Sequence, residues 1–483
     1  MVSLKKFLMF FTSSRSISRN RTVTKQGSEM LFNTRGKTVI RSLLSVTLIV
    51  ASLGVSVGMF SSVAQAEEDE KKYGDVKTKQ RHAVGKACAK RLEGVQEVVG
   101  GDKEPTKQQL QDLARKLPGY MSKDCATSYE KSNVYNMLGF IHYSLDNYDG
   151  ALDAYLKLIR EPDADDRQRL STRYTVAQLY MLQEKYAEAV KQLEAWMKEA
   201  TVIGDSARIL LAQAYYQVNR KDDALKIVNK VIADSEANGQ LPKESWWSLQ
   251  RVLYYEKEDY GRVTEILKKL VTHYPSLNYW KQLGGMYAQL EKDMNQLVST
   301  EVVYLQKGLT QERQLLTLAY LYLGAGAPYR AALLIENGMK QDIIEESAKN
   351  LELLGSVWQQ AQSTDKAAVV LERAAKLSGK GEIYARLAGV YLDQDESVKA
   401  ARAAKNALSK GGLKRPELTH LALGSAYVNL HCYGDAVKSF RQSAKYDKTK
   451  KASNQWIAYA TAEGDRRTKL ISAGAKISGC TKV

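Results

Sequence analysis

The chain has 483 residues, of which 44% are hydrophobic, and a formal net charge of +17 at pH 7. Residues 1–66, which we expect to be removed on export, hold nine Lys or Arg and one Glu. The rest therefore carries +9, which we expect to be spread along the chain without a dense basic run. An exported protein with this modest excess is not expected to bind nucleic acid.

The N-terminus has the pattern of an export signal. A basic segment after Met30 leads into an apolar run over residues 43–60 and then into Ala64-Gln65-Ala66. This order is typical of a secretory signal peptide, so we expect residues 30–66 to be cleaved after Ala66 and the mature protein to lie in the periplasm. An uncleaved membrane anchor is the alternative. Residues 1–29 add nothing that a signal needs and are interpreted as an over-extended start.

Residues 67–131 are expected to form an N-terminal helical cap. The four cysteines, Cys88, Cys125, Cys432 and Cys480, lie in two groups near the ends of the mature chain. In an exported protein this favours two disulfides, Cys88–Cys125 and Cys432–Cys480, which would hold the terminal caps. Four cysteines allow three pairings, and zinc binding is the rival interpretation, although the spacings do not form a CxxC pair.

A helical repeat returns about every 35 residues between residues 132 and 447. Its clearest copy is Trp280-x-x-Leu283-Gly284-x-x-Tyr287, the opening of a tetratricopeptide repeat. A small residue recurs where two helices of one pair must touch, and an aromatic residue usually follows three positions later. The small positions are Gly139, Ala177, Ala212, Gly284, Ala319, Gly355, Ala388 and Gly424, and Arg251 takes this place in the fourth pair. We expect an all-α, right-handed superhelical solenoid of about nine helix pairs.

The inner surface of such a solenoid is the expected binding surface. We expect it to be lined by the residue after the small position and by the residue three further on. Large side chains at or near these places offer contact area for a peptide or helix. The candidates are Phe140, Tyr143, Tyr174, Met181, Tyr216, Tyr255 and Tyr320. The alternative is that these side chains pack against the neighbouring repeat.

Residues 448–483 are expected to form a C-terminal capping helix and tail. The most basic patches of the mature chain lie beside or within this segment, at Lys445-Lys448-Lys450-Lys451 and at Arg466-Arg467-Lys469. Such patches can meet an acidic partner or a phospholipid surface. The alternative is a solvated helix face.

No motif for catalysis or for a cofactor is recognisable. The five histidines form no H-x-x-x-H pair, and the sequence has no phosphate loop and no G-x-S-x-G motif. We therefore expect a binding protein that is not an enzyme, with no metal site and no cofactor.

Several segments narrow the resemblance beyond the repeat class. They are Ala83-Val84-Gly85-Lys86-Ala87-Cys88, Tyr148-Asp149-Gly150-Ala151-Leu152, Gly326-Ala327-Pro328-Tyr329-Arg330-Ala331-Ala332 and Trp456-Ile457-Ala458-Tyr459. With the export signal, they make residues 67–483 resemble the exported tetratricopeptide-repeat proteins that accompany the TonB system of marine gammaproteobacteria. The resemblance implies a periplasmic accessory of TonB, ExbB and ExbD in iron-siderophore uptake. An assembly factor for outer-membrane, pilus or secretion machinery is the alternative function.

Overall fold

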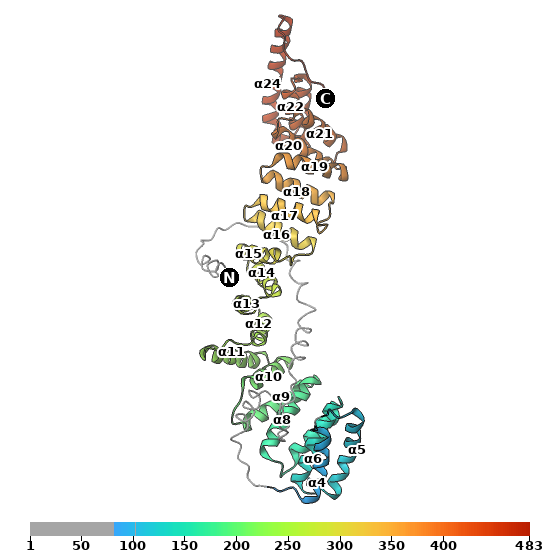
Figure 1. Ribbon diagram of the computed structural model, residues 1–483. Coiled ribbons are helices and arrows are strands. Elements are labelled where there is room, and N and C mark those ends of the chain that lie inside the picture. The colour runs from blue at the N-terminus through green and yellow to red at the C-terminus, as the bar shows by residue number, and fades with distance from the viewer. Residues whose placement is uncertain (1–81, 102) are drawn as a thin grey trace. The chain divides into compact units, whose positions relative to one another are not determined.

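The computed structural model describes residues 82–101 and 103–483, in which every regular element is an α-helix (Figure 1). The all-α fold class predicted from the repeat pattern is thereby confirmed. Within these residues, nine antiparallel pairs follow the helices α4 (Lys86–Val99) and α5 (Lys107–Lys123), and α24 (Asp447–Ser472) follows the last pair. The predicted signal peptide and the segment before it lie outside the described residues.

The nine pairs are α6 (Ser128–Ser144) with α7 (Tyr148–Arg160), α8 (Asp166–Leu182) with α9 (Tyr186–Glu199), α10 (Asp205–Gln217) with α11 (Lys221–Ala237), α12 (Glu244–Glu256) with α13 (Tyr260–His273), α14 (Leu277–Gln289) with α15 (Asp293–Leu305), α16 (Glu312–Gly324) with α17 (Pro328–Lys340), α18 (Ala348–Gln360) with α19 (Thr364–Ser378), α20 (Gly381–Asp393) with α21 (Ser397–Lys410), and α22 (Pro416–Asn429) with α23 (Tyr433–Ser443). The described chain divides into two compact units between Leu270 and Val271, within the last turn of α13.

The turn inside each pair has one backbone conformation. The residue seven places after the small position has a positive φ in all nine pairs. The N–H of the following residue donates a hydrogen bond to the carbonyl of the aromatic position. In the first pair, where His142 stands at the aromatic position, this bond runs from Asn147 and is 2.9 Å long. This left-handed residue ends the first helix and satisfies one of its last carbonyl groups. The residues are Asp146, Glu184, Asn219, Glu258, Glu291, Gly326, Gln362, Asp395 and His431.

Hydrogen bonds from the aromatic positions join neighbouring pairs. The Tyr215 hydroxyl donates to Glu194 of the preceding pair at 2.8 Å, and Arg220 reaches the same carboxylate at 2.8 Å while it covers the Tyr215 ring. These donors lower the pKa of Glu194, and burial followed by the bond to Glu194 raises the pKa of Tyr215 to about 12. Tyr322 and Arg330 repeat the arrangement in the second unit, on Glu301.

A disulfide stands near each end of the described chain. Cys88 in α4 bonds to Cys125 just after α5, and both residues are fully buried. Cys432, in the turn before α23, bonds to Cys480 in the tail that follows α24. The predicted pairing is therefore present, and none of the four thiols is left to bind zinc.

Glu130 ties the start of the described chain to the first helix pair. Its carboxylate accepts hydrogen bonds from the Gly85 N–H at 2.8 Å and from the Thr127 N–H and hydroxyl at 3.1 and 2.9 Å. Burial raises the pKa of Glu130, but the hydrogen bonds to Gly85 and Thr127 together outweigh it and hold the pKa below its ordinary value. This carboxylate caps α6 and also holds the residue that precedes α4.

The Glu130 site should make stability depend on pH. Because the folded-state pKa is lowered, the carboxylate stabilises the fold above its ordinary pKa of 4.5, and this contribution is lost as the pH falls through the folded-state value. Glu130→Gln should lower stability near neutral pH by about 1–2 kcal/mol. Urea unfolding of both proteins at several pH values is the measurement. The wild type should approach the variant as the pH falls below 4.5, and parallel curves would contradict this assignment.

Candidate functional site

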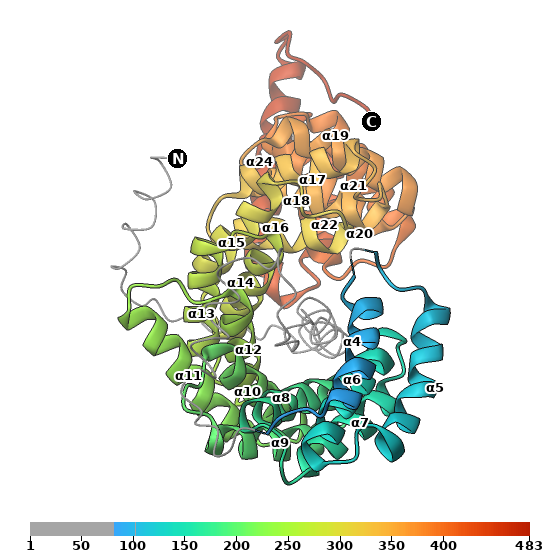
Figure 2. The same cartoon turned by 60° about the horizontal axis from the view of Figure 1, so that its bottom comes forward.

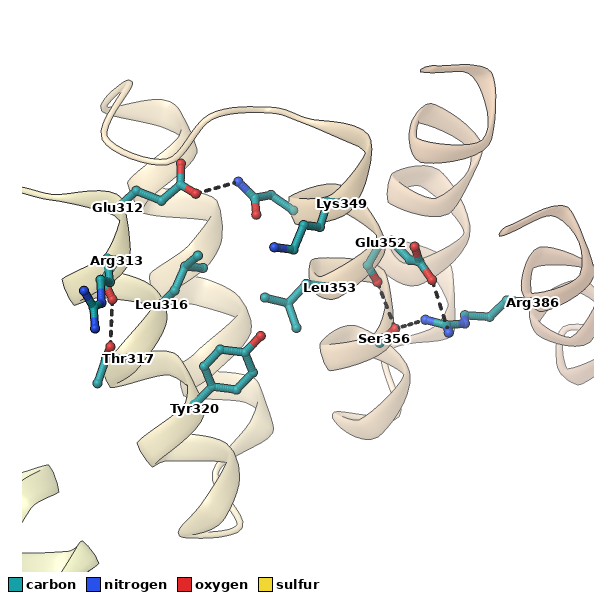
Figure 3. Close-up of a pocket in the computed structure, with 11 residues that line it drawn as sticks. Glu312, Arg313, Leu316, Thr317, Tyr320, Lys349, Glu352, Leu353, Ser356 and Arg386 are labelled. Carbon is teal, nitrogen blue, oxygen red and sulfur yellow. Dashed lines mark hydrogen bonds and ion pairs between the residues drawn. The ribbon is translucent and has the colours of Figure 1, made fainter. Parts of the chain in front are cut away.

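The second unit has a groove on the first helices of three consecutive pairs, α16, α18 and α20 (Figure 3). Its volume is about 660 Å³. Repeated helix pairs place the first helices side by side, so equivalent positions of successive pairs form one continuous surface. The lining residues are Glu312, Arg313, Leu316, Thr317, Tyr320, Lys349, Asn350, Glu352, Leu353, Ser356 and Arg386.

The floor of the groove is apolar. Leu316 and Tyr320 are one helical turn apart on α16, so both side chains lie on the same face. Leu316 and Leu353 are partly buried against the core of the second unit, whereas Tyr320 is 56% exposed. Figure 3 shows Tyr320 and Leu353 extending from facing helices into the same space. An exposed ring above aliphatic side chains can bury an apolar side chain of a partner.

Hydrogen bonds at one end of the groove hold α16 to the start of α18. Glu312 accepts from the Asn350 side-chain amide at 3.2 Å and from the Glu345 backbone N–H at 3.0 Å. The Asn350 amide also donates to the Glu345 carbonyl at 2.9 Å, and Asn350 is only 4% exposed. These hydrogen bonds hold the start of α18 against α16 at this end of the groove.

The cationic side chains of the groove differ in their surroundings. Arg386 forms an ion pair with Glu352 at 3.3 Å and donates a hydrogen bond to Ser356 (Figure 3). Lys349 is exposed at the start of α18 and forms no ion pair with any described residue. Arg386 therefore helps to join α18 to α20, and Lys349 can meet an anionic group of a partner beside the apolar floor.

Tyr320 is the predicted binding residue that the structure places in this groove. The other six candidates lie in the first unit. Met181 is only 2% exposed, so its assignment to a groove surface is wrong. A methionine at this place in α8 fills the space between packed helices and offers no accessible surface.

The remaining first-unit candidates are half-buried and contact their own helix pair or an adjacent part of the chain. The rings of Tyr143 and Tyr255 lie 5.8 Å from those of Tyr148 and Tyr260, which open the following helices. The Tyr174 ring lies 5.1 Å from the Trp196 ring, measured between centroids. The Tyr216 hydroxyl donates a hydrogen bond to Glu256 at 2.6 Å. Phe140 packs against the N-terminal core. These contacts account for the partial burial of the five residues, but three of the residues pack within their own pair and not on the neighbouring repeat. A role in binding stays a prediction.

Sequence reasoning missed most of the groove. Apart from Tyr174, it considered positions after the small residue of each pair, whereas Arg313, Leu316, Lys349, Leu353 and Arg386 precede it. Helical periodicity, counted from Tyr320 toward the N-terminus, would have identified the residues that were missed. Positions four and seven residues before an inward-facing Tyr320 lie on the same helical face, and they are Leu316 and Arg313.

Comparisons with known proteins find one family model that matches part of the chain and solved structures of low sequence identity. Residues 144–231 match the family described as "Anaphase-promoting complex, cyclosome, subunit 3". No curated protein matches the chain. Among solved structures, a tetratricopeptide repeat protein from Parabacteroides merdae is 13% identical, with 52% of this chain and 94% of that chain covered and a TM-score of 0.33.

Two further structures are similar over other lengths. The "APC/C hetero-tetramer Cut9-Hcn1" is 14% identical over 77% of this chain and 86% of that chain, with a TM-score of 0.27. "YrrB: a TPR protein with an unusual peptide-binding site" is 14% identical over 40% of this chain and 94% of that chain, with a TM-score of 0.31. Likenesses at this level carry no argument about function. The repeat motif and the nine helix pairs with one shared turn geometry have the architecture of a tetratricopeptide-repeat solenoid.

Proposed function

We propose that this protein is a non-catalytic periplasmic scaffold that holds a segment of a protein partner in the groove of α16, α18 and α20. The observation that carries the proposal is the exposed ring of Tyr320 above Leu316 and Leu353, with Lys349 beside them. A partner segment that places an apolar side chain on this floor would bury aromatic and aliphatic surface together, which is typical of strong binding sites. A carboxylate of the same segment would meet Lys349.

We further propose that the scaffold works with TonB, ExbB and ExbD in energy-dependent uptake. The support is the predicted export signal and the resemblance of residues 67–483 to repeat proteins that accompany this system. An accessory of that complex needs a surface that grips another protein, and the groove offers one. Tetratricopeptide repeats are interaction scaffolds, so this role requires no catalytic group.

Complementation of a deletion strain tests both parts. Removal of the protein should impair uptake of a TonB-dependent substrate, and the wild-type gene should restore it. Tyr320→Ala combined with Lys349→Glu should restore it poorly, because these changes remove the exposed ring and reverse the charge beside it. We expect partner affinity to fall at least tenfold, or about 1.4 kcal/mol.

Val369→Ala combined with Lys226→Glu is the matched control. Val369 is 61% exposed on α19 and Lys226 is exposed on α11, and neither lines the groove. Normal uptake of the TonB-dependent substrate in the deletion strain would contradict the TonB assignment. Loss of an envelope structure with normal uptake would favour an assembly factor. Full rescue by the groove variant, at equal protein level, would remove the groove from the function.

A further inference from the structure

The positive charge of the mature chain is concentrated at its C-terminal end. Residues 397–483 contain 17 Lys or Arg and five Asp or Glu, a net charge of +12, whereas residues 67–396 contain 45 and 48 and have a net charge of −3. The expectation of an evenly spread excess is therefore wrong. The basic segment corresponds to α21 to α24 and the tail after them.

Most of this charge is not neutralised within the described part of the chain. Four of these 17 side chains form ion pairs there, and they are Lys399, Arg415, Lys438 and Arg466. Lys448, Lys450 and Lys451, in the first turns of α24, are exposed and have no ion pair among the described residues. Net charge of this density attracts an anionic surface over about 8 Å at physiological salt.

Apolar side chains are exposed on the same helix. Seven residues spaced at steps of three and four form one face of α24, which we call the α24 stripe. They are Lys448, Ala452, Trp456, Tyr459, Glu463, Arg466 and Leu470. Trp456 is 39% and Tyr459 is 52% exposed, and their rings meet edge to face with centroids 5.7 Å apart. Trp456 also stacks on Phe440 of α23, which fixes the orientation of the aromatic pair.

The far end of α24 continues this apolar surface. Ile471 is 55% and Leu470 is 36% exposed in the last turn, and α24 continues past α22 in both Figure 1 and Figure 2. The tail folds back from this end to the Cys432–Cys480 disulfide, and Arg467 donates a hydrogen bond to the Ser478 carbonyl. The helix is therefore held in place while its stripe stays exposed.

We propose that the α24 stripe binds the surface of an anionic phospholipid membrane. Trp and Tyr favour the interface between lipid headgroups and acyl chains, and lysines beside them attract anionic headgroups. No helix in the described part is long and apolar enough to cross a bilayer. The proposal places α24 along the membrane surface. A second copy is a poor occupant, because two segments of +12 repel each other. This inference does not depend on the groove.

Co-sedimentation with lipid vesicles tests the proposal. Vesicles of phosphatidylcholine alone are compared with vesicles that also contain phosphatidylglycerol, at low and high salt. The apolar run of residues 43–60 could bind lipid by itself, so the full chain and the chain that starts at Glu67 are measured in parallel. Both should bind the anionic vesicles, and salt should weaken the binding of the shorter chain.

Two pairs of charge reversals separate binding through the lysines at the start of α24 from general electrostatic attraction. In the chain that starts at Glu67, Lys448→Glu with Lys451→Glu should lower the partition coefficient by more than about 30-fold, because the loss of each basic residue near an anionic surface costs about fivefold and each new carboxylate is repelled by that surface. Lys191→Glu with Lys226→Glu makes the same change of net charge at exposed positions of the first unit. This control should bind nearly as well as the parent chain.

Quenching by brominated phospholipid locates the contact. Trp456 is the most exposed of the six tryptophans, so lipid bromine should quench part of the fluorescence, and Trp456→Phe should remove that part while it keeps a ring beside Phe440. Equal loss in both charge variants, or unchanged quenching in Trp456→Phe, would overturn the proposal. Binding to heparin or an acidic protein without binding to vesicles would also overturn it.

Discussion

Removal of the Cys88–Cys125 disulfide should destabilise the N-terminal cap by about 4 kcal/mol. The bond closes a loop with a sequence separation of 37, and a cross-link of this length restricts the unfolded chain by roughly that free energy. Both cysteines are fully buried among Leu92, Val95 and Leu117, so the bond also joins α4 to α5 inside the core of the cap. In the double variant Cys88→Ala, Cys125→Ala, the N-terminal cap should therefore unfold before the rest of the chain.

Hydrogen exchange read by mass spectrometry checks this result. Each repeat contacts mainly its neighbours, so protection should be lost in α4 and α5 and kept in α16 to α20. The matched variant Cys432→Ala, Cys480→Ala should lose protection in α23 and α24 instead, because its disulfide joins the last turn to the tail. Uniform loss along the chain in either variant would show that the disulfides do not act locally.

The second large effect is that alanine should change stability in opposite directions at two glycines that occupy the same repeat position. A Cβ on Gly139 would lie 2.4 Å from the ring of Tyr155, which is 5% exposed and packed in the core. Gly139→Ala should therefore destabilise the first pair by about 1–3 kcal/mol through overpacking. A Cβ on Gly284 would meet Thr300 and Ser299 at ordinary distances of 3.5 and 3.6 Å.

Gly284→Ala should accordingly stabilise the protein by up to about 1 kcal/mol, since alanine is the better helix former. Urea unfolding of the two variants beside the wild type is the measurement. Gly424→Ala should behave like Gly139→Ala, because its Cβ would lie 2.4 Å from Phe440. Destabilisation by all three substitutions would show that the position needs glycine for a reason other than the residue that faces it.

The repeat phase and the pairing of the helices could be predicted from the sequence, and these glycines show why. The residue that faces the small position lies 16 places later, so Tyr155 faces Gly139 and Phe440 faces Gly424. A large ring on the second helix of a pair requires glycine at the facing position of the first helix, and both residues can be identified in the sequence. Where Thr300 stands instead, Gly284 follows the repeat pattern without a steric need.

The candidate binding surface was harder to predict because an inward-facing ring can be covered by its own repeat. Tyr143 and Tyr255 satisfy the position rule, yet each contacts a tyrosine five residues later, at the start of the second helix. Tyr320 lies directly after its small residue and stays exposed. The difference depends on the side chains across the turn and on neighbouring first helices, which a rule based on one helix does not include.

Site-specific photo-crosslinking in living cells tests the central claim most directly. A photoreactive amino acid at Tyr320 places the probe on the groove floor, and the same residue at Val369 places it on an exposed position of α19 outside the groove. The account predicts a discrete adduct from Tyr320 that contains a segment of a protein partner, which is weakened by Lys349→Glu and absent from Val369. Adducts from Val369 but not from Tyr320 would contradict the account and assign binding to another surface.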